Sequence, residues 1–221
     1  MRQKRSPRRQ LRDLWIALAV GTAVFGVMAV LQVWEPLAFD RAVYRGISSL
    51  ESPAVTLFFK GVTFLGDTTW FIVLCLGLLL LVRPRWRGGL FVLNALLAGG
   101  ANQGLKRLFE RARPDDNPLI TVGGFSFPSG HSMGAMAIYG MLIYAVWHTA
   151  WSFRRKAAFT AALSCLILLV GISRIYLGVH FASDVLAGFG AGLASLSLFL
   201  LILTGIQRRG LLTPPGNEKR E

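Results

Sequence analysis

Three short stretches of this sequence combine residue types that bind anions or transfer protons. They are KRLFERARP at 106–114, FPSGHS at 127–132 and GISRIYLGVHFASD at 171–184. Charged side chains are costly to bury in apolar surroundings, so ionisable groups within apolar segments usually mark functional sites. The third stretch places an arginine, a histidine and an aspartate between two long apolar runs, which makes it a candidate site.

The histidine and the aspartate of the third stretch are suited to nucleophilic chemistry. His180 and Asp184 are four residues apart, so we expect them on one face of a helix. A carboxylate there can hydrogen-bond one ring nitrogen, fix the tautomer and leave the other nitrogen free to attack. The alternative is a structural His–Asp pair that closes a helix end. A membrane boundary disfavours that alternative, because burial of such a pair is costly.

The other two stretches supply groups that suit a phosphate. Lys106 offers a compact point charge and Arg113 a planar fork of donors. Ser129 and Gly130 lie where a helix is expected to begin, and free N–H groups at a helix start attract anions. Each stretch alone also has an ordinary explanation, a solvated basic loop or a helix cap. His131 is a candidate proton donor or, alternatively, a structural histidine.

Together the three stretches contain the groups that phosphoryl transfer requires. Lys106, Arg113 and Arg174 can stabilise negative charge on phosphoryl oxygens, and this catalysis depends mainly on positioning and electrostatics. A second histidine can protonate the leaving oxygen. The adjacent acids Asp115 and Asp116 are expected to form a loop turn rather than a Mg²⁺ site. The sequence therefore predicts neither a metal nor another cofactor.

These residues resemble the tripartite signature of the type 2 phosphatidic acid phosphatase superfamily, K-x6-RP, PSGH and SR-x5-H-x3-D. Every fixed position is present in the correct order and spacing between residues 106 and 184. The resemblance implies an extracytoplasmic active site and a phosphohistidine intermediate. It implies His180 as nucleophile, Asp184 as its orienting carboxylate and His131 as general acid. The phosphate-binding residues that it implies are Lys106, Arg113, Ser129, Gly130 and Arg174, with Ser173 in a supporting position.

Several residues outside the signature are expected to have no role in catalysis. Arg107 and Arg111 are predicted to be surface charges, and His148, near the far end of its helix, to be structural. Cys75 and Cys165 lie in apolar runs, so both are predicted to be buried small hydrophobic residues.

The composition of the chain indicates a polytopic membrane protein. Of its 221 residues, 53% are hydrophobic and 16% are charged. A helix needs about 20 apolar residues to cross the hydrocarbon core, and the second qualifying segment is short enough that we expect it to extend back through Phe64. The six segments are 14–34, 68–82, 88–105, 132–150, 157–175 and 181–206. We therefore predict an all-α fold, a six-transmembrane-helix bundle with short interfacial helices.

The connection between the first two spans and the small residues of the last span carry further signals. The connection, 35–67, is expected to form two short interfacial helices, the second starting at Ser52-Pro53; a surface loop is the alternative. Gly188 and Gly192 predict a close-packing face on the last helix. On the third span, an inward face is predicted from its polar residues, Asn94, Asn102 and Gln103. The membrane domain is predicted to occupy 14–206, between a basic tail, 1–13, and a polar tail, 207–221.

The distribution of charge predicts the orientation in the membrane. Sixteen of the 24 Lys and Arg lie in the N-terminal tail, at 83–87, at 154–156 and after Ile206. By the positive-inside rule these segments and both termini are cytoplasmic, which explains the net charge of +13 without a nucleic-acid partner. The three candidate stretches then lie on the extracytoplasmic side of a bacterial cytoplasmic membrane.

The leading interpretation is a membrane lipid phosphatase that acts on a phosphate monoester or pyrophosphate of a lipid in the bilayer. Within the superfamily, the chain is most similar to bacterial phosphatases of the phosphatidylglycerophosphate phosphatase B type. Their substrates are phosphatidylglycerophosphate, phosphatidate or undecaprenyl pyrophosphate. A lipid phosphotransferase with the same site is the alternative. A non-enzymatic transporter is less favoured, because the titratable groups gather near one face instead of the midplane. The lipid and the oligomeric state stay open.

Overall fold

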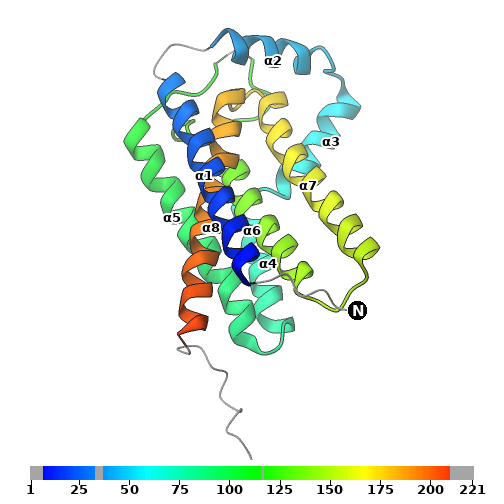
Figure 1. The fold of residues 1–221 in the computed structure, drawn as a ribbon. Coiled ribbons are helices and arrows are strands. Elements are labelled where there is room, and N and C mark those ends of the chain that lie inside the picture. The colour runs from blue at the N-terminus through cyan, green and yellow to red at the C-terminus, as the bar shows by residue number, and fades with distance from the viewer. Residues whose placement is uncertain (1–6, 33–36, 116, 210–221) are drawn as a thin grey trace, which may run out of the picture.

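The computed structural model describes residues 7–32, 37–115 and 117–209, and these form eight α-helices without a strand (Figure 1). The all-α prediction is therefore confirmed. The outer parts of the two predicted tails, the end of the first predicted span and Asp116 lie outside the described residues. The helices are α1 (Pro7–Leu31), α2 (Ala38–Ser48), α3 (Pro53–Phe64), α4 (Thr68–Leu81), α5 (Arg85–Phe109), α6 (Gly130–Trp147), α7 (Phe153–Tyr176) and α8 (Ala182–Arg208).

The described helices give three or four candidate membrane spans, by length and composition, where the sequence predicted six. The three are α1, α7 and α8, and the fourth is α3 with α4, which are bent by 47° at the break between them. The second span was predicted to extend back through Phe64, and the candidate span formed by the bent pair of α3 and α4 includes that residue. Asp67 explains the break, because its carboxylate accepts a hydrogen bond from Thr69 N at 2.8 Å and starts a new helix.

Small residues let the neighbours of α8 approach it closely. A Cβ added to Gly188 or Gly192 would lie 2.6 Å from a backbone oxygen of α6, that of Ser129 or Met133. Gly190 meets the backbone of α1 in the same way. The predicted close-packing face is confirmed, and its main consequence is that the start of α6 is pressed onto α8.

Two of the three polar residues of α5 that were predicted to face the bundle do so, whereas Gln103 is exposed because it lies one position along the helix from the buried Asn102. Asn94 and Asn102 are buried, and the Nδ2 of Asn94 donates to the backbone oxygen of Ala137 at 2.9 Å. The prediction for the two cysteines is half correct. Cys75 is buried, whereas Cys165 is exposed because its side of α7 is not covered by the described part of the bundle.

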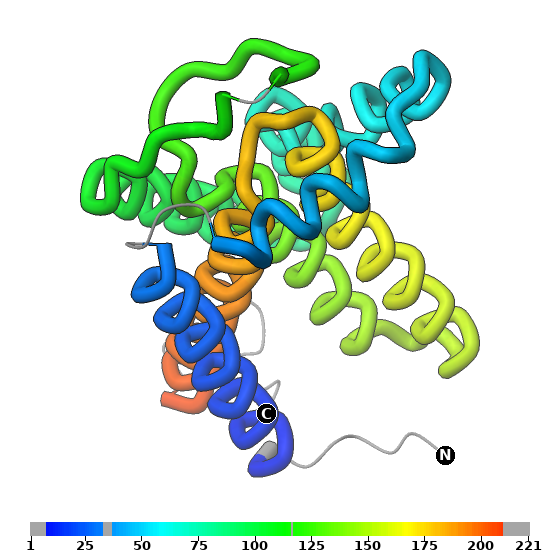
Figure 2. Tube along the Cα trace, turned by 90° about the horizontal axis from the view of Figure 1, so that it is seen from above, coloured from blue at the N-terminus to red at the C-terminus, as the bar shows by residue number. Residues whose placement is uncertain are grey.

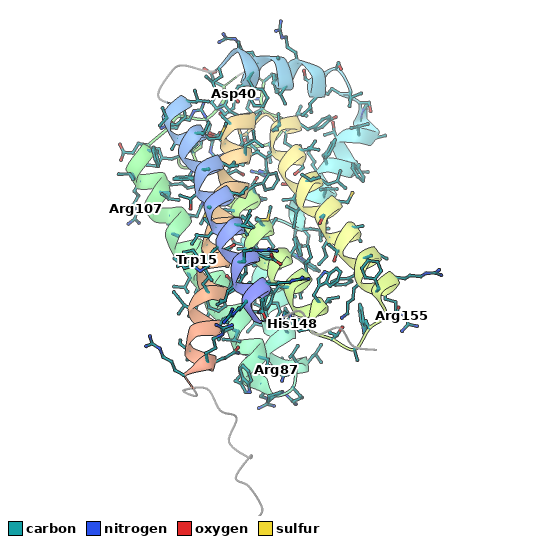
Figure 3. The ribbon with its side chains drawn as sticks, viewed as in Figure 1. Trp15, Asp40, Arg87, Arg107, His148 and Arg155 are labelled. Carbon is teal, nitrogen blue, oxygen red and sulfur yellow. The ribbon has the colours of Figure 1, made fainter. Side chains whose placement is uncertain are left out.

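One end of the bundle is crossed by a short helix, and the other carries the two basic loops. Figure 2 shows α2 running across one end, where it contacts α7 and α8. Arg87, Arg155 and His148 lie at the opposite end from Asp40 (Figure 3), so the two basic loops share one end, as the charge distribution predicted. The connection between the first two spans forms two short helices, α2 and α3. Ser52 caps α3 by accepting a hydrogen bond from Val55 N.

Candidate active site

The three chemically unusual stretches meet at the end of the bundle that α2 crosses. Lys106 lies in the last turn of α5, Arg113 in the following loop and His131 in the first turn of α6. Arg174 lies in the last turn of α7, and His180 lies in the turn before α8. All five side chains line one cavity of about 700 Å³. The structure thus brings together groups that are spread over 75 positions of the chain.

His180 and Asp184 are paired, but not on the shared helix face that the sequence predicted. Helix α8 begins at Ala182, so His180 precedes it. Asp184 turns back over the helix start, where its Oδ2 accepts from Phe181 N at 2.9 Å. The same oxygen lies 3.4 Å from Nδ1 of His180. The prediction failed because Asp184 caps the N-terminus of α8, a role that spacing alone does not distinguish from a helical i,i+4 pair.

The second ring nitrogen of His180 faces the cavity. Its Nε2 lies 3.2 Å from Nη1 of Arg113, and a guanidinium can act only as a donor. Nε2 is therefore the acceptor nitrogen with the lone pair, and Nδ1 carries the hydrogen and lies 3.3 Å from Oγ of Ser126 and 3.4 Å from Oδ2 of Asp184. Burial lowers the pKa of His180 to about 4, against the raising influence of Asp184. The imidazole is consequently neutral near pH 7, and its lone pair on the cavity side faces Arg113.

The three cations around His180 are held in place before any ligand arrives. Arg113 donates to the backbone oxygens of Gly124 at 2.9 Å and of Val179 at 2.8 Å. Lys106 donates to the backbone oxygens of Phe125 and Ser126 in the same loop. Backbone carbonyls carry no net charge, so they orient the two cationic side chains without neutralising them. Oriented cations of this kind can stabilise negative charge on a bound phosphate.

Arg174 lines the cavity wall and is anchored by α3. Its Nη1 donates to Oγ1 of Thr63 on α3 at 2.7 Å, which fixes the side chain. Its Nε is buried and has no hydrogen-bond partner among the described residues. A buried N–H without a partner costs free energy, so this part of the side chain carries a local penalty.

The start of α6 forms the remaining wall. Ser129 is the buried N-cap residue, and its Oγ accepts from Oγ of Ser132 at 3.0 Å. Gly130 follows, and a Cβ there would lie 2.9 Å from Oδ1 of Asn102. The sequence PSGH therefore combines a capped helix start with a residue small enough for close approach. The positive end of α6 faces the cavity through Gly130 and His131.

Three residues that were not predicted surround Asp184. Ser126 donates from Oγ to its Oδ2 at 2.5 Å. Arg111 was predicted to be a surface charge, and that was wrong: its side chain is 9% exposed, and its Nη1 lies 2.7 Å from Oδ1 of Asp184. Its Nη2 lies 3.3 Å from Oδ2 of Asp40 on α2.

The sequence contained a signal that Asp40 is buried, but none that Arg111 is. Asp40 precedes Val43 and Ile47 by three and seven residues, so an acid interrupts the apolar face of a short helix. Nothing distinguished Arg111 from Arg107, which is exposed as predicted.

The remaining candidates lie outside the constellation. Ser173 is buried and donates from Oγ to the backbone oxygen of Val170 at 2.6 Å, so the hydrogen of its hydroxyl is used within α7. His148 ends α6 at the far end of the bundle and packs against Tyr144. Asp115 accepts a backbone hydrogen bond from Asn117, consistent with a turn. Within the described ranges, no group of three or more His, Cys, Asp or Glu is placed to hold a metal ion.

An all-helical membrane bundle with a histidine–aspartate pair beside three cations has the groups that suit phosphoryl transfer. The family model of the PAP2 superfamily matches residues 87–208, and the chain belongs to this superfamily. The resemblance seen in the motifs is thereby confirmed.

Known relatives agree in sequence and in fold. The chain is 36% identical over 167 residues to phosphatidylglycerophosphatase B of Bacillus subtilis (strain 168), an alignment that covers 74% of this chain and 81% of the relative. It is 37% identical over 120 residues to dolichyldiphosphatase of Saccharomyces cerevisiae, covering 50% and 49%. The crystal structure of a transmembrane PAP2-type phosphatidylglycerolphosphate phosphatase from Bacillus subtilis superposes with a TM-score of 0.76 at 32% identity, covering 86% of this chain and 98% of that one. The chain is thus a phosphatase that acts on phosphoric esters and a multi-pass membrane protein.

Proposed function

We propose that this protein hydrolyses the phosphate monoester or pyrophosphate of a membrane lipid through a phosphohistidine intermediate. The candidate substrates are phosphatidylglycerophosphate, phosphatidate and undecaprenyl pyrophosphate. The observation that carries the proposal is the shape of the cavity. From the cations it continues between α4 and α5, along Ile72, Leu76 and Leu96. These three side chains are more than half exposed, so the cavity extends to a lipid-facing side.

The geometry suggests how the reaction begins. Nε2 of His180 attacks the phosphorus, a P–N bond forms and the P–O bond to the lipid breaks. The carboxylate of Asp184, 3.4 Å from Nδ1, offsets the positive charge that develops on the ring. His131 protonates the departing oxygen. Lys106, Arg113 and Arg174, with the N–H groups at the start of α6, stabilise the negative charge on the phosphoryl oxygens.

The second half of the reaction regenerates the enzyme. Water attacks the phosphorus of the phosphohistidine and gives one proton to His131, the P–N bond breaks and inorganic phosphate leaves. His131 lies at the start of α6, beside Gly66 in the break between α3 and α4, and this position supports both roles. A Cβ at Gly66 would lie 3.1 Å from Cδ2 of His131, so the glycine provides space for the ring.

The proposed topology has six spans, with both termini in the cytoplasm and the site on the extracytoplasmic side of a bacterial cytoplasmic membrane. The spans would be α1, the bent pair of α3 and α4, and α5 to α8, within a domain at 14–206. The basic loops at 83–87 and 154–156 support it, because they share the end of the bundle opposite the site. Cysteine accessibility on intact cells tests this orientation.

The first experiment measures phosphate release by the purified protein in detergent. Phosphatidylglycerophosphate, phosphatidate and undecaprenyl pyrophosphate are offered separately. Release from at least one lipid, abolished in His180→Ala, is the expected result, because without the imidazole no phosphohistidine forms. Appreciable release by a folded His180→Ala protein would overturn the nucleophile assignment. If no phosphate is released from any of the three lipids, but the phosphoryl group is transferred to an added acceptor lipid, the protein is a phosphotransferase instead.

A further inference from the structure

A buried cluster of charges lies directly behind the nucleophile. The side chains of Asp40 and Asp184 are fully buried and that of Arg111 nearly so, and the guanidinium lies between the two carboxylates. The guanidinium also stacks over the ring of Phe181, with its carbon 4.3 Å from the ring centroid. Neither Arg111 nor Asp40 lines the cavity. The cluster therefore acts on the site from behind, without contact with the substrate.

Arg111 divides the two oxygens of Asp184 between different partners. Its Nη1 occupies Oδ1 at 2.7 Å. The other oxygen, Oδ2, is left to face Ser126, Phe181 N and Nδ1 of His180. A charge-assisted hydrogen bond to one oxygen fixes the rotation of the carboxylate. Arg111 thus sets the direction from which Asp184 meets the imidazole.

Asp40 fixes the other side of Arg111 and connects α2 to the start of α8. Its Oδ1 accepts from Ser183 N at 2.8 Å, and its Oδ2 accepts from Oγ of Ser183 at 2.8 Å. Asp40 and Ser183 are 143 positions apart in the chain. The same Oγ accepts from Nη1 of Arg111 at 2.8 Å. The first turn of α8, which contains Asp184, is therefore held by α2 and by the loop after α5 together.

We infer that Arg111 and Asp40 are positioning residues for the His180–Asp184 pair. They hold the Asp184 carboxylate so that the imidazole keeps its hydrogen on Nδ1 and its lone pair on Nε2. This inference rests on the proposed function of His180 as nucleophile. It adds to the superfamily signature an arginine within its first motif and an acid that lies far outside it.

The test compares Arg111→Gln and Asp40→Asn with Arg45→Gln as a control. Arg45 is exposed on α2, so its substitution changes the charge equally without touching the cluster. Arg111→Gln is expected to lower kcat about 100-fold with little change in KM, because a misplaced catalytic group costs rate of this order and the side chain does not contact substrate. Asp40→Asn should lower kcat about 10-fold, since Arg111 keeps Asp184 as a partner. The double variant should be no worse than Arg111→Gln, because the two residues act as a unit.

A second measurement is independent of turnover. The chain has three histidines, so ¹⁵N-histidine NMR in detergent, assigned with His180→Ala, reports the His180 tautomer directly. The wild-type spectrum should show the hydrogen on Nδ1, and Arg111→Gln should show a mixture of tautomers. A mixture in Arg111→Gln without lipid turnover in the wild type would sustain the inference about positioning and reject the proposed function.

Two results would overturn the inference. In the first, Arg111→Gln matches Arg45→Gln in kcat. In the second, its activity falls only in proportion to the fraction of unfolded protein, while the His180 spectrum of the folded fraction matches the wild type. Arg111→Lys separates charge from geometry: one ammonium cannot bridge two carboxylates as the planar fork does, so kcat should be intermediate.

Discussion

The contact between α6 and α8 at Gly188 gives a sharp test of how the phosphate-binding wall is held. A Cβ at this position would lie 2.6 Å from the backbone oxygen of Ser129 and 2.8 Å from Cβ of Ser132. Neither atom can rotate away. Because ordinary contacts begin at 3.4 Å, Gly188→Ala must separate the start of α6 from α8 by about 0.8 Å, if packing there is as dense as in other protein interiors.

This displacement acts on stability and on catalysis to different extents. Overpacking of a close contact destabilises a protein by about 1–3 kcal/mol. The same shift moves Ser129 and Gly130 relative to His180, which is fixed at the start of α8, and a misplacement of about 1 Å lowers the rate about 100-fold. We therefore expect Gly188→Ala to remain largely folded in detergent while its kcat falls far more than its folded fraction.

The assay measures kcat, KM and the thermal midpoint of the variant in the same detergent. Gly77→Ala on α4 is the matched control, because its Cβ would meet no atom within 4 Å, and it should be neutral or more stable by about 0.5–1 kcal/mol. Wild-type kcat and thermal midpoint in Gly188→Ala would show that the wall tolerates the shift and would refute this reasoning.

Three further predictions address pH, local backbone and metals. Because burial lowers the pKa of His180 to about 4, the folded protein binds fewer protons than the unfolded chain between about pH 6.5 and pH 4. The free energy of unfolding should therefore fall as the pH falls through this window, and the fall should be smaller in His180→Gln. An acid limb of the kcat/KM profile near pH 6.5 would contradict the lowered pKa of His180. Glu110 ends α5 with a φ of 45°, so Glu110→Gly should raise the free energy of unfolding by about 0.5–1 kcal/mol in denaturant titrations; a loss would show that the side chain matters more than the backbone. EDTA should leave phosphate release unchanged, because three cationic side chains supply the positive charge; activity that is lost and then restored by Mg²⁺ would count against this view.

Local pattern predicted those features of the fold that depend on neighbours in the chain. The apolar runs indicated the helices, Ser52 indicated the start of α3, and the small residues indicated the close face of α8. The same kind of evidence failed where a polar residue has two possible roles. Asp184 has the spacing of a helical partner to His180, yet it caps the helix start, and Asp67 divides a run that looked continuous.

Features that depend on distant segments were beyond the sequence. Arg111 and Arg107 are alike in type, and only the approach of distant residues buries one of them: Asp40, 71 positions away, and Asp184, 73 positions away. The prediction that Cys165 is buried failed for a related reason. The sequence of an apolar helix does not reveal which of its sides neighbouring helices cover. His131 and Arg174 lie at the same end of the bundle because α6 leads away from that end and α7 returns to it.

The apolar extension of the cavity between α4 and α5 has a consequence for how the enzyme meets its substrate. A head group at the cations would leave its hydrocarbon chains along Ile72, Leu76 and Leu96, level with the surrounding lipid. Entry would then occur sideways, by diffusion within one leaflet, and the relevant concentration would be the mole fraction of substrate in the surface. Added inert detergent would dilute the substrate in two dimensions even at constant bulk molarity, and lipid composition would regulate turnover as directly as substrate supply.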